Sequence, residues 1–200
     1  MNVYVESNFV IELALLQEQR DICERILEVC GTDGVQLVIP AYCLAEPYEA
    51  LTRRRKRRTK MKQELDAEFG QIARTETRAD RLRGFRDITE LLTASIEEEE
   101  KQLDAVCSRL SETAEVIPLD DNILAMSREC RSEHDFSPQD SVVYATVLAH
   151  LALNPGTRSC LIDKDKDFHD RRVVEELAGY RCELLRDFGA GYGFIVAGGD

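Results

Sequence analysis

Short apolar runs alternate with helical segments along most of this chain. Runs of strand length occur at residues 3–5, 36–39, 116–117, 160–162 and 182–185, and capped or amphipathic segments separate them. Because strands that alternate with helices form right-handed parallel βαβ units, the sequence predicts an α/β fold. We expect three layers around a central, mainly parallel sheet.

Start and stop signals locate several of the helices. Gly31 ends the helical segment that precedes the second strand. Ser137, Pro138 and Asp140 supply a cap, a proline at the first helical position and an acid in the first turn. They predict a helix that runs through Ala149. The glycine-rich tail FGAGYGFIVAGGD has no clear pattern, and we assign it no element.

Residues 48–115 form a long charged segment without proline, in which Gly70 and Gly84 are the expected breaks. The composition favours helix, so we predict a helical hairpin inserted into a single domain that spans residues 1–200. An apolar stripe with helical spacing follows its second half and should pack on the first arm or on a second subunit. The stripe consists of Leu82, Phe85, Ile88, Leu92, Ile96, Leu103, Val106 and Leu110.

The composition fits a protein with a substantial core and no membrane partner. Of the 200 residues, 44% are hydrophobic, and no stretch approaches the roughly 20 apolar residues of a membrane span. Glu6 and Glu12 interrupt the N-terminal apolar segment, unlike in a secretion signal, so we expect a cytoplasmic protein. The seven scattered cysteines never form the close pairs of zinc or redox sites, and they predict reduced, mostly buried thiols.

The charge is unevenly distributed. A net charge of −12 argues against a protein that coats nucleic acid over its whole surface. Eight of the 26 basic residues nevertheless fall within positions 53–62, which contain no acid. The sequence therefore predicts a compact cationic stripe on an acidic body.

Acidic residues follow the predicted strands or open the predicted helices at four separate places. The carboxyl ends of parallel strands meet at one edge of a sheet, so these acids should share one cleft. Carboxylates packed together repel one another unless a cation compensates them, and a hard divalent ion such as Mg²⁺ or Mn²⁺ suits oxygen ligands. The acids are Glu6, Glu46, Asp140 and the cluster Asp163, Asp165 and Asp167.

Two other interpretations of the DKDKDF segment fail. Asp163, Asp165 and Asp167 match the first, third and fifth positions of a calcium-binding loop. Phe168 replaces the glycine of the sixth position, however, and Val174 replaces the glutamate of the twelfth. A strand followed by Asp-x-Asp also resembles the haloacid-dehalogenase phosphatases. Only 35 residues follow Asp165, too few for the rest of that fold.

The order of these acidic segments resembles the PIN-domain nucleases, metal-dependent enzymes that cut RNA. Glu6 stands where the family has its first aspartate, and Glu46 and Asp140 match its next two acids. The fourth acid falls on Asp165, with Asp163 as the alternative. The resemblance implies that these five residues are metal ligands and catalytic groups, supported from a second shell by Ser7, Asn8 and Asp167.

The resemblance implies a divalent-metal-dependent endoribonuclease in which a metal-activated water hydrolyses RNA phosphodiesters. Small members are often toxins neutralised by a protein antitoxin, and many form homodimers, so both partners are expected. The alternative is a catalytically weak or inactive PIN-like protein that binds RNA or protein. The basic run begins about two helical turns after Glu46 and should contact RNA phosphates through Arg53, Arg54, Arg55, Lys56, Arg57, Arg58 and Lys60.

Overall fold

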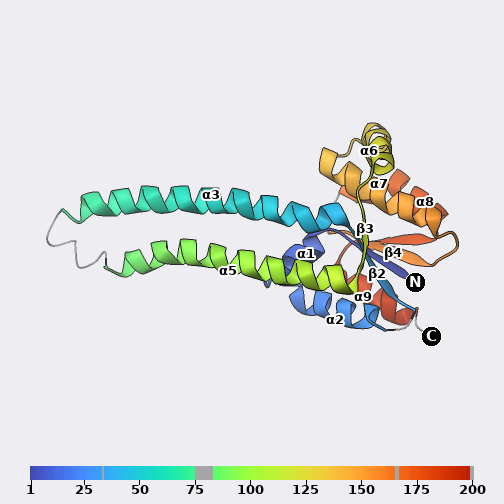
Figure 1. Cartoon of the computed structure of the whole chain (residues 1–200), viewed down its shortest axis with the longest axis horizontal. Coiled ribbons are helices and arrows are strands. Elements are labelled where there is room, and N and C mark those ends of the chain that lie inside the picture. The colour runs from blue at the N-terminus through green and yellow to red at the C-terminus, as the bar shows by residue number, and fades with distance from the viewer. Residues whose placement is uncertain (33, 75–82, 165–166, 199–200) are drawn as a thin grey trace.

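A parallel sheet of five strands forms the centre of the protein in a computed structural model of the chain (Figure 1). The structure describes residues 1–32, 34–74, 83–164 and 167–198, and at 83–87 and 167 it describes the backbone alone. The strand order is β3-β2-β1-β4-β5. The strands are β1 (Asn2–Val5), β2 (Gln36–Pro40), β3 (Glu115–Ile117), β4 (Ser159–Ile162) and β5 (Cys182–Leu185).

All the strand pairings within the sheet are parallel, which confirms the predicted α/β class. Val3 of β1 lies opposite Leu37 of β2 on one side and opposite Cys160 of β4 on the other. Every residue of β1 and β4 is buried. Near-continuous burial is typical of parallel strands that are covered on both faces, so these central strands carry few polar side chains before their carboxyl ends.

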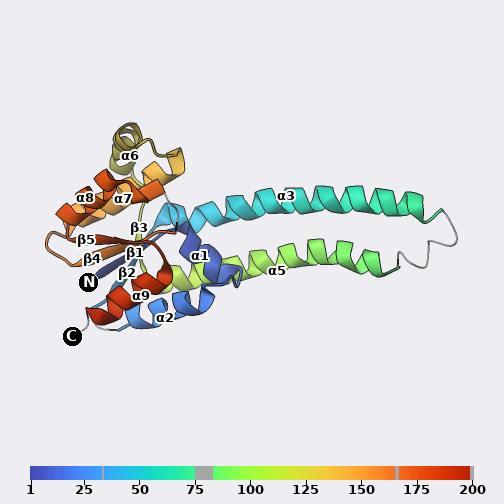
Figure 2. The same ribbon diagram turned by 180° about the vertical axis from the view of Figure 1, so that it is seen from behind.

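Helices cover both faces of the sheet, as the two opposite views show (Figures 1 and 2). The layer formed by α6, α7 and α8 lies on one face, and α2 and α9 lie on the other, where they pack together. The helices of the body are α1 (Ser7–Ala14), α2 (Arg20–Cys30), α6 (Asp121–His134), α7 (Pro138–Leu153), α8 (Arg171–Gly179) and α9 (Phe188–Ala197), with a 3₁₀ turn, η2 (Asp167–His169).

Two long helices, α3 (Ala41–Ile72) and α5 (Arg83–Thr113), extend side by side away from the sheet (Figures 1 and 2). From Leu51 onward, the positions of α3 that are shielded from solvent are spaced by three or four residues, and a matching row follows α5. This spacing is typical of two helices that pack along one seam. The seam contains Leu51, Arg54, Arg58, Lys62, Leu65 and Phe69 of α3 and Thr89, Leu92, Ile96, Glu99, Leu103, Val106 and Leu110 of α5.

The hairpin differs from the sequence prediction in detail. Helix α3 begins at Ala41 and continues past Gly70, so Glu46 and Pro47 lie inside it. The predicted apolar stripe is wrong at Ile88, whose side chain is 54% exposed, because the three- and four-residue spacing brings Thr89 into the seam instead. Leu82 lies outside the described residues, as does the side chain of Phe85. The assignment of residues 1–200 to one domain with an insertion at 48–115 stays a prediction.

Residues Phe188–Ala197 of the glycine-rich tail form α9, an element that the sequence pattern did not predict. Gly191 is buried in this helix, and a Cβ there would overlap the Cδ1 atom of Ile162 on β4. The absence of a side chain at Gly191 therefore lets α9 approach the sheet closely.

Two further predictions concern the state of the cysteines and the absence of a membrane-spanning segment. All seven cysteines are free thiols, and six of them are buried, as expected. Within the described part of the chain, no helix combines the length and the apolar character needed to cross a membrane.

Candidate active site

Two neighbouring strands end in buried carboxylates. Glu6 follows β1 and is 6% exposed, and its side chain accepts a hydrogen bond from the backbone N–H of Asn8 at 2.8 Å. This contact caps α1, whose N-terminal dipole favours a negative charge. Asp163 follows β4 and is 1% exposed, and its N–H donates to the carbonyl of Leu185 at 2.9 Å. Because β1 and β4 pair in parallel, both acids lie at the same edge of the sheet.

Two half-buried carboxylates come from helices. Glu46 lies in the second turn of α3, where the Ser7 hydroxyl donates a hydrogen bond to its Oε2 atom. Asp140 lies in the first turn of α7, and Ser137 contacts it twice. The Ser137 hydroxyl oxygen accepts from the Asp140 N–H at 3.1 Å and donates to its carboxylate. Each of these acids is therefore held by a serine.

One pocket of about 180 Å³ brings these carboxylates together. Glu6, Glu46, Asp140 and Asp163 all line it, although residue numbers 6 and 163 span most of the chain. The other lining residues are Ser7, Asn8, Ile11, Ala50, Arg53, Val143 and Phe168.

Part of the predicted DKDKDF cluster cannot be compared with this pocket. Asp165 lies outside the described residues, and only the backbone of Asp167 is described, at the start of η2. The choice between Asp163 and Asp165 as the fourth ligand therefore stays a prediction.

The donor set suits a hard divalent cation, because all four acids offer carboxylate oxygens. In residues 1–32, 34–74, 83–164 and 167–198, no three Asp, Glu, His or Cys side chains form a group that could hold a metal ion. The residue types therefore fit Mg²⁺ or Mn²⁺, but the described side chains alone do not form a closed coordination sphere.

Two groups beside the acids, Cys43 and Tyr42, have raised pKa values, so neither adds a charge of its own at neutral pH. Burial and the negative charge of Glu6 raise the pKa of the Cys43 thiol well above its usual value. Burial and the charge of Glu46 raise the pKa of the Tyr42 hydroxyl as well. Among the described residues that line the pocket, Arg53 is the only cation. The pocket is therefore strongly acidic and favours a cationic occupant.

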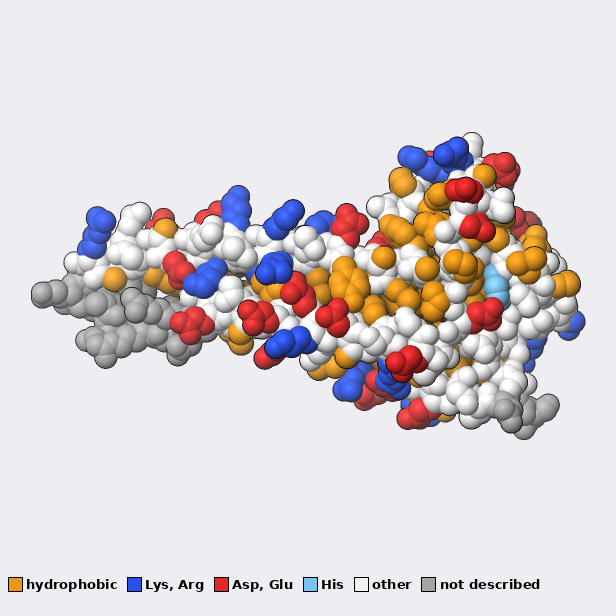
Figure 3. Space-filling view, viewed as in Figure 1, with side chains coloured by type: hydrophobic (Ala, Val, Ile, Leu, Met, Phe, Trp, Pro, Cys, Tyr) orange, Lys and Arg blue, Asp and Glu red, His pale blue; other side chains and the backbone are white. Residues whose placement is uncertain are grey.

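The basic run divides into groups with different surroundings. Arg54 and Arg58 lie in the hairpin seam, where both contact Glu99 of α5, at 3.4 and 3.0 Å. Arg55 pairs with Glu100 at 2.9 Å. Several cationic side chains, with acidic ones between them, stand along the free edge of α3, and both charges are also mixed where α3 meets α5 (Figure 3). Part of the run thus holds the hairpin together, and RNA contact by the run stays a prediction.

An ion pair anchors the segment that carries Asp163. The Lys164 ammonium lies 2.6 Å from Oε1 of Glu12, which is 2% exposed and whose Oε2 accepts from the Gln19 N–H at 2.8 Å. The hydrogen bond with Glu12 raises the pKa of Lys164 above its usual value, so the ammonium group stays charged at neutral pH. No sequence pattern indicates this contact, because the partners are 152 residues apart.

We expect Glu12→Gln to destabilise the protein by about 1–2 kcal/mol, a value discounted for the partial exposure of Lys164. Glutamine can still accept from Gln19 but leaves the Lys164 ammonium without its carboxylate. Urea unfolding would measure the loss, with the exposed Glu18→Gln as the control, which should stay within about 0.5 kcal/mol of the parent. Equal stability of the two variants would show that the ion pair contributes nothing.

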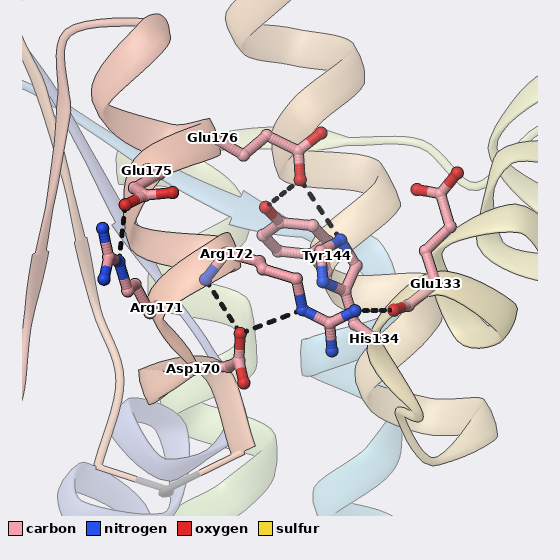
Figure 4. A network of polar contacts seen from close by, with 8 residues as sticks. All are labelled: Glu133, His134, Tyr144, Asp170, Arg171, Arg172, Glu175 and Glu176. Carbon is pink, nitrogen blue, oxygen red and sulfur yellow. Dashed lines mark hydrogen bonds and ion pairs between the residues drawn. The ribbon is translucent and has the colours of Figure 1, made fainter.

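A polar network joins α6, α7 and α8 (Figure 4). The Tyr144 hydroxyl donates to Glu176 at 2.7 Å, and His134 lies 3.3 Å from the same carboxylate oxygen. Arg172 donates to the carbonyl of Glu133 at 2.8 Å. Tyr144 also packs against Phe168, which lines the pocket. The network therefore fixes the helix that carries Asp140 relative to the segment that carries Phe168.

A five-stranded parallel sheet with carboxylates gathered at the carboxyl ends of its strands defines an α/β protein with an acidic pocket. The sequence model of the PIN domain family matches residues 3–168, and the chain belongs to this family. PIN domains are generally divalent-metal-dependent nucleases, in keeping with the resemblance noted from the sequence.

A solved structure has a similar fold. A chain in the crystal structure of VapBC2 from Rickettsia felis bound to a DNA fragment from their promoter is 14% identical, with a TM-score of 0.51, over 92% of this chain and 97% of that one. A chain of VapBC-1 from nontypeable Haemophilus influenzae is 13% identical, with a TM-score of 0.45, over 94% and 99%. A search of curated proteins found no match.

Proposed function

We propose that the protein is a divalent-metal-dependent endoribonuclease. The observation that carries the proposal is the pocket lined by Glu6, Glu46, Asp140 and Asp163, since acids from separate elements would repel one another there without a cation. Membership of the PIN domain family supports the same chemistry. Asp165 is included as a further ligand and catalytic group on the strength of the sequence resemblance alone.

The proposed roles follow from the contacts of each side chain. The carboxylates would hold Mg²⁺ or Mn²⁺, which supplies an activated water and compensates charge on the phosphate. Ser7 holds Glu46 in place, and the Asn8 N–H holds Glu6, so both act on the ligands from behind. Asp167 is proposed for a similar supporting role. Arg53 at the pocket is suited to a bidentate contact with a phosphate.

We also propose a biological role as the toxin of a toxin–antitoxin pair. Small PIN-domain proteins often have this role, and the fold is similar to a chain of a VapBC2 complex that is bound to promoter DNA. A protein antitoxin and a homodimer are the partners that this role implies. RNA is the proposed substrate, and the cytoplasm is the expected location.

A second candidate is a PIN-domain protein that binds RNA or protein without cutting RNA. Within the described ranges, the acids of the pocket do not form a group of three that could hold a metal ion, which favours this alternative. One carboxylate oxygen of Glu6 is also engaged in capping α1. Metal binding separates the two candidates.

Metal binding should raise the thermal unfolding midpoint of the metal-free protein. A ligand that binds only the native state stabilises it by about 2.7 kcal/mol at a concentration of 100 times its dissociation constant. We expect this rise with millimolar Mn²⁺ or Mg²⁺ and its loss in Asp163→Asn, which removes a buried carboxylate from the pocket. Cleavage of bulk RNA, measured with and without the metal, then tests the activity.

The exposed Asp121→Asn is a suitable control for this experiment, since it removes one acid that does not line the pocket. It should keep the metal response of the parent. If the parent shows neither a metal-dependent shift nor RNA cleavage, the nuclease proposal is wrong and the binding protein is the better description.

A further inference from the structure

The pocket side of α3 continues outward as a cationic stripe. Glu46, Ala50 and Arg53 all line the pocket from this helix, at spacings of four and three residues. With 3.6 residues per turn, the same face next presents Arg57 and then Lys60. Arg53 and Lys60 are separated by seven positions, or about 10 Å along the helix axis. The stripe formed by Arg53, Arg57 and Lys60 therefore begins at the acids and leads away from them.

The other cations of the run face elsewhere. Arg54 and Arg58 lie in the seam with α5, and the Arg58 side chain is only 24% exposed. Arg55 pairs with Glu100 of α5, and Lys62, which also lies in the seam, is 2.6 Å from Asp66. On helical geometry, Arg55 and Lys62 lie on roughly the opposite side of α3 from the stripe. These side chains stabilise the hairpin and its surface.

The side chains of the stripe are open to a ligand. Arg57 is exposed, and no acidic side chain in the described part of the chain lies within 4.0 Å of it. Arg53 is 3.4 Å from Glu49 and Lys60 is 3.8 Å from Glu64, but all four side chains are more than 60% exposed. Exposed pairs of this kind contribute little, so a phosphate can replace the carboxylate.

We propose that an RNA strand bound in the pocket continues along α3, with its phosphates held by Arg53, Arg57 and Lys60. This inference rests on the proposed function. The rest of the chain is acidic enough to give a net charge of −12, so a polyanion gains contacts along this stripe and is repelled elsewhere. The hairpin thereby sets the path of the strand, and the acids meet the phosphodiester at one end of it.

The test compares two double variants with the same change in charge. Arg57→Ala with Lys60→Ala removes two cations of the stripe, and Arg55→Ala with Lys62→Ala removes two cations from the opposite side of α3. Both are made in an Asp140→Asn background, which keeps the RNA intact. Fluorescence anisotropy of a labelled single-stranded oligouridylate, measured over a series of salt concentrations, gives the affinity and its salt dependence. Thermal unfolding checks that both variants remain folded.

Loss of two phosphate contacts on a single strand should reduce the slope of log affinity against log salt by about 1.4. At about 0.1 M salt, this corresponds to affinity weakened by roughly 10- to 30-fold in the stripe variant. The control variant should keep the slope of its Asp140→Asn background. Equal slopes in the two variants, or no RNA binding in any of the proteins, would overturn the stripe as an RNA path.

The binding experiment tests the RNA path independently of the nuclease proposal, because either proposal can fail while the other stands. If the protein with Asp140 intact cuts RNA with Mn²⁺ but the two double variants bind alike, the stripe is wrong and the nuclease proposal stands. If the stripe variant alone loses affinity but the protein with Asp140 intact never cuts RNA, the RNA path stands on a protein that only binds.

Discussion

Asp140→Asn should reduce metal-dependent RNA cleavage by about 10³-fold, because loss of a carboxylate that holds the metal removes several kcal/mol of transition-state stabilisation. Asparagine keeps the size of the side chain and the backbone N–H that donates to Ser137, so the start of α7 stays capped. The change therefore removes a charge from the pocket without removing the helix cap. Initial rates of bulk RNA cleavage at one Mn²⁺ concentration would measure the effect.

Asp121→Asn is the matched control, because it makes the same chemical change in the first turn of another helix, α6. Its rate should stay within about twofold of the parent, which corresponds to less than 0.5 kcal/mol. Asp140→Asn should also keep the unfolding midpoint of the metal-free protein. A rate equal to that of the parent would remove Asp140 from the catalytic site, and an equal loss in both variants would point to a contaminating nuclease.

The acids of the candidate site could be predicted from the sequence because their positions follow from the strands. Glu6 and Asp163 come directly after apolar runs, and parallel strands bring their carboxyl ends to one edge whatever the sequence distance between them. Asp140 follows a recognisable helix start. Once the order of strands and helices was predicted, that order was enough to place Asp140 beside the other acids.

Contacts that depend on the exact orientation of a helix could not be predicted in the same way. In the sequence the basic run is one continuous charged segment. In the structure it lies within α3, which begins at Ala41, so its side chains face different directions around the helix. Arg58 reaches Glu99 in the seam, while Arg53 reaches the pocket. The predicted seam was also wrong at one position. The sequence pattern placed Ile88 in it, whereas the packing of the two helices buries the neighbouring Thr89.

Helix α9 was missed for a different physical reason. Glycine disfavours helix by about 1 kcal/mol per residue, so the segment that begins at Phe188 has weak local preference. Tertiary contacts compensate: Phe188 packs edge-to-face on Phe9, and the Arg25 side chain lies over the ring of Tyr192. Gly191 is what allows this helix to lie close to Ile162. The glycine that lowers the local signal is therefore the residue that the packing requires.

Gly191→Ala should accordingly destabilise the protein by about 1–3 kcal/mol, the usual cost of overpacking a core. The added Cβ would overlap Cδ1 of Ile162 and lie 2.9 Å from its Cγ1, so α9 or β4 must shift. Gly193→Ala in the same helix is the control, because no atom of the described residues lies within 4 Å of a Cβ at that position. There alanine should stabilise by up to about 1 kcal/mol through its higher helix propensity. Urea unfolding of both variants would show whether the free energy of unfolding falls in Gly191→Ala and rises in Gly193→Ala.

Ile162→Val identifies the cause of the Gly191→Ala loss, since valine lacks the Cδ1 atom that meets the new methyl group. By itself this change should cost about 0.5–1.5 kcal/mol, as for other buried isoleucines. In its presence, Gly191→Ala should cost about 1 kcal/mol less than in the parent, a coupling expected for residues in contact. Additive losses would mean that the two positions do not touch, and the close packing of α9 on β4 would then be wrong. If Ile162→Val is coupled to Gly191→Ala but not to Gly193→Ala, then α9 is a packed part of the core.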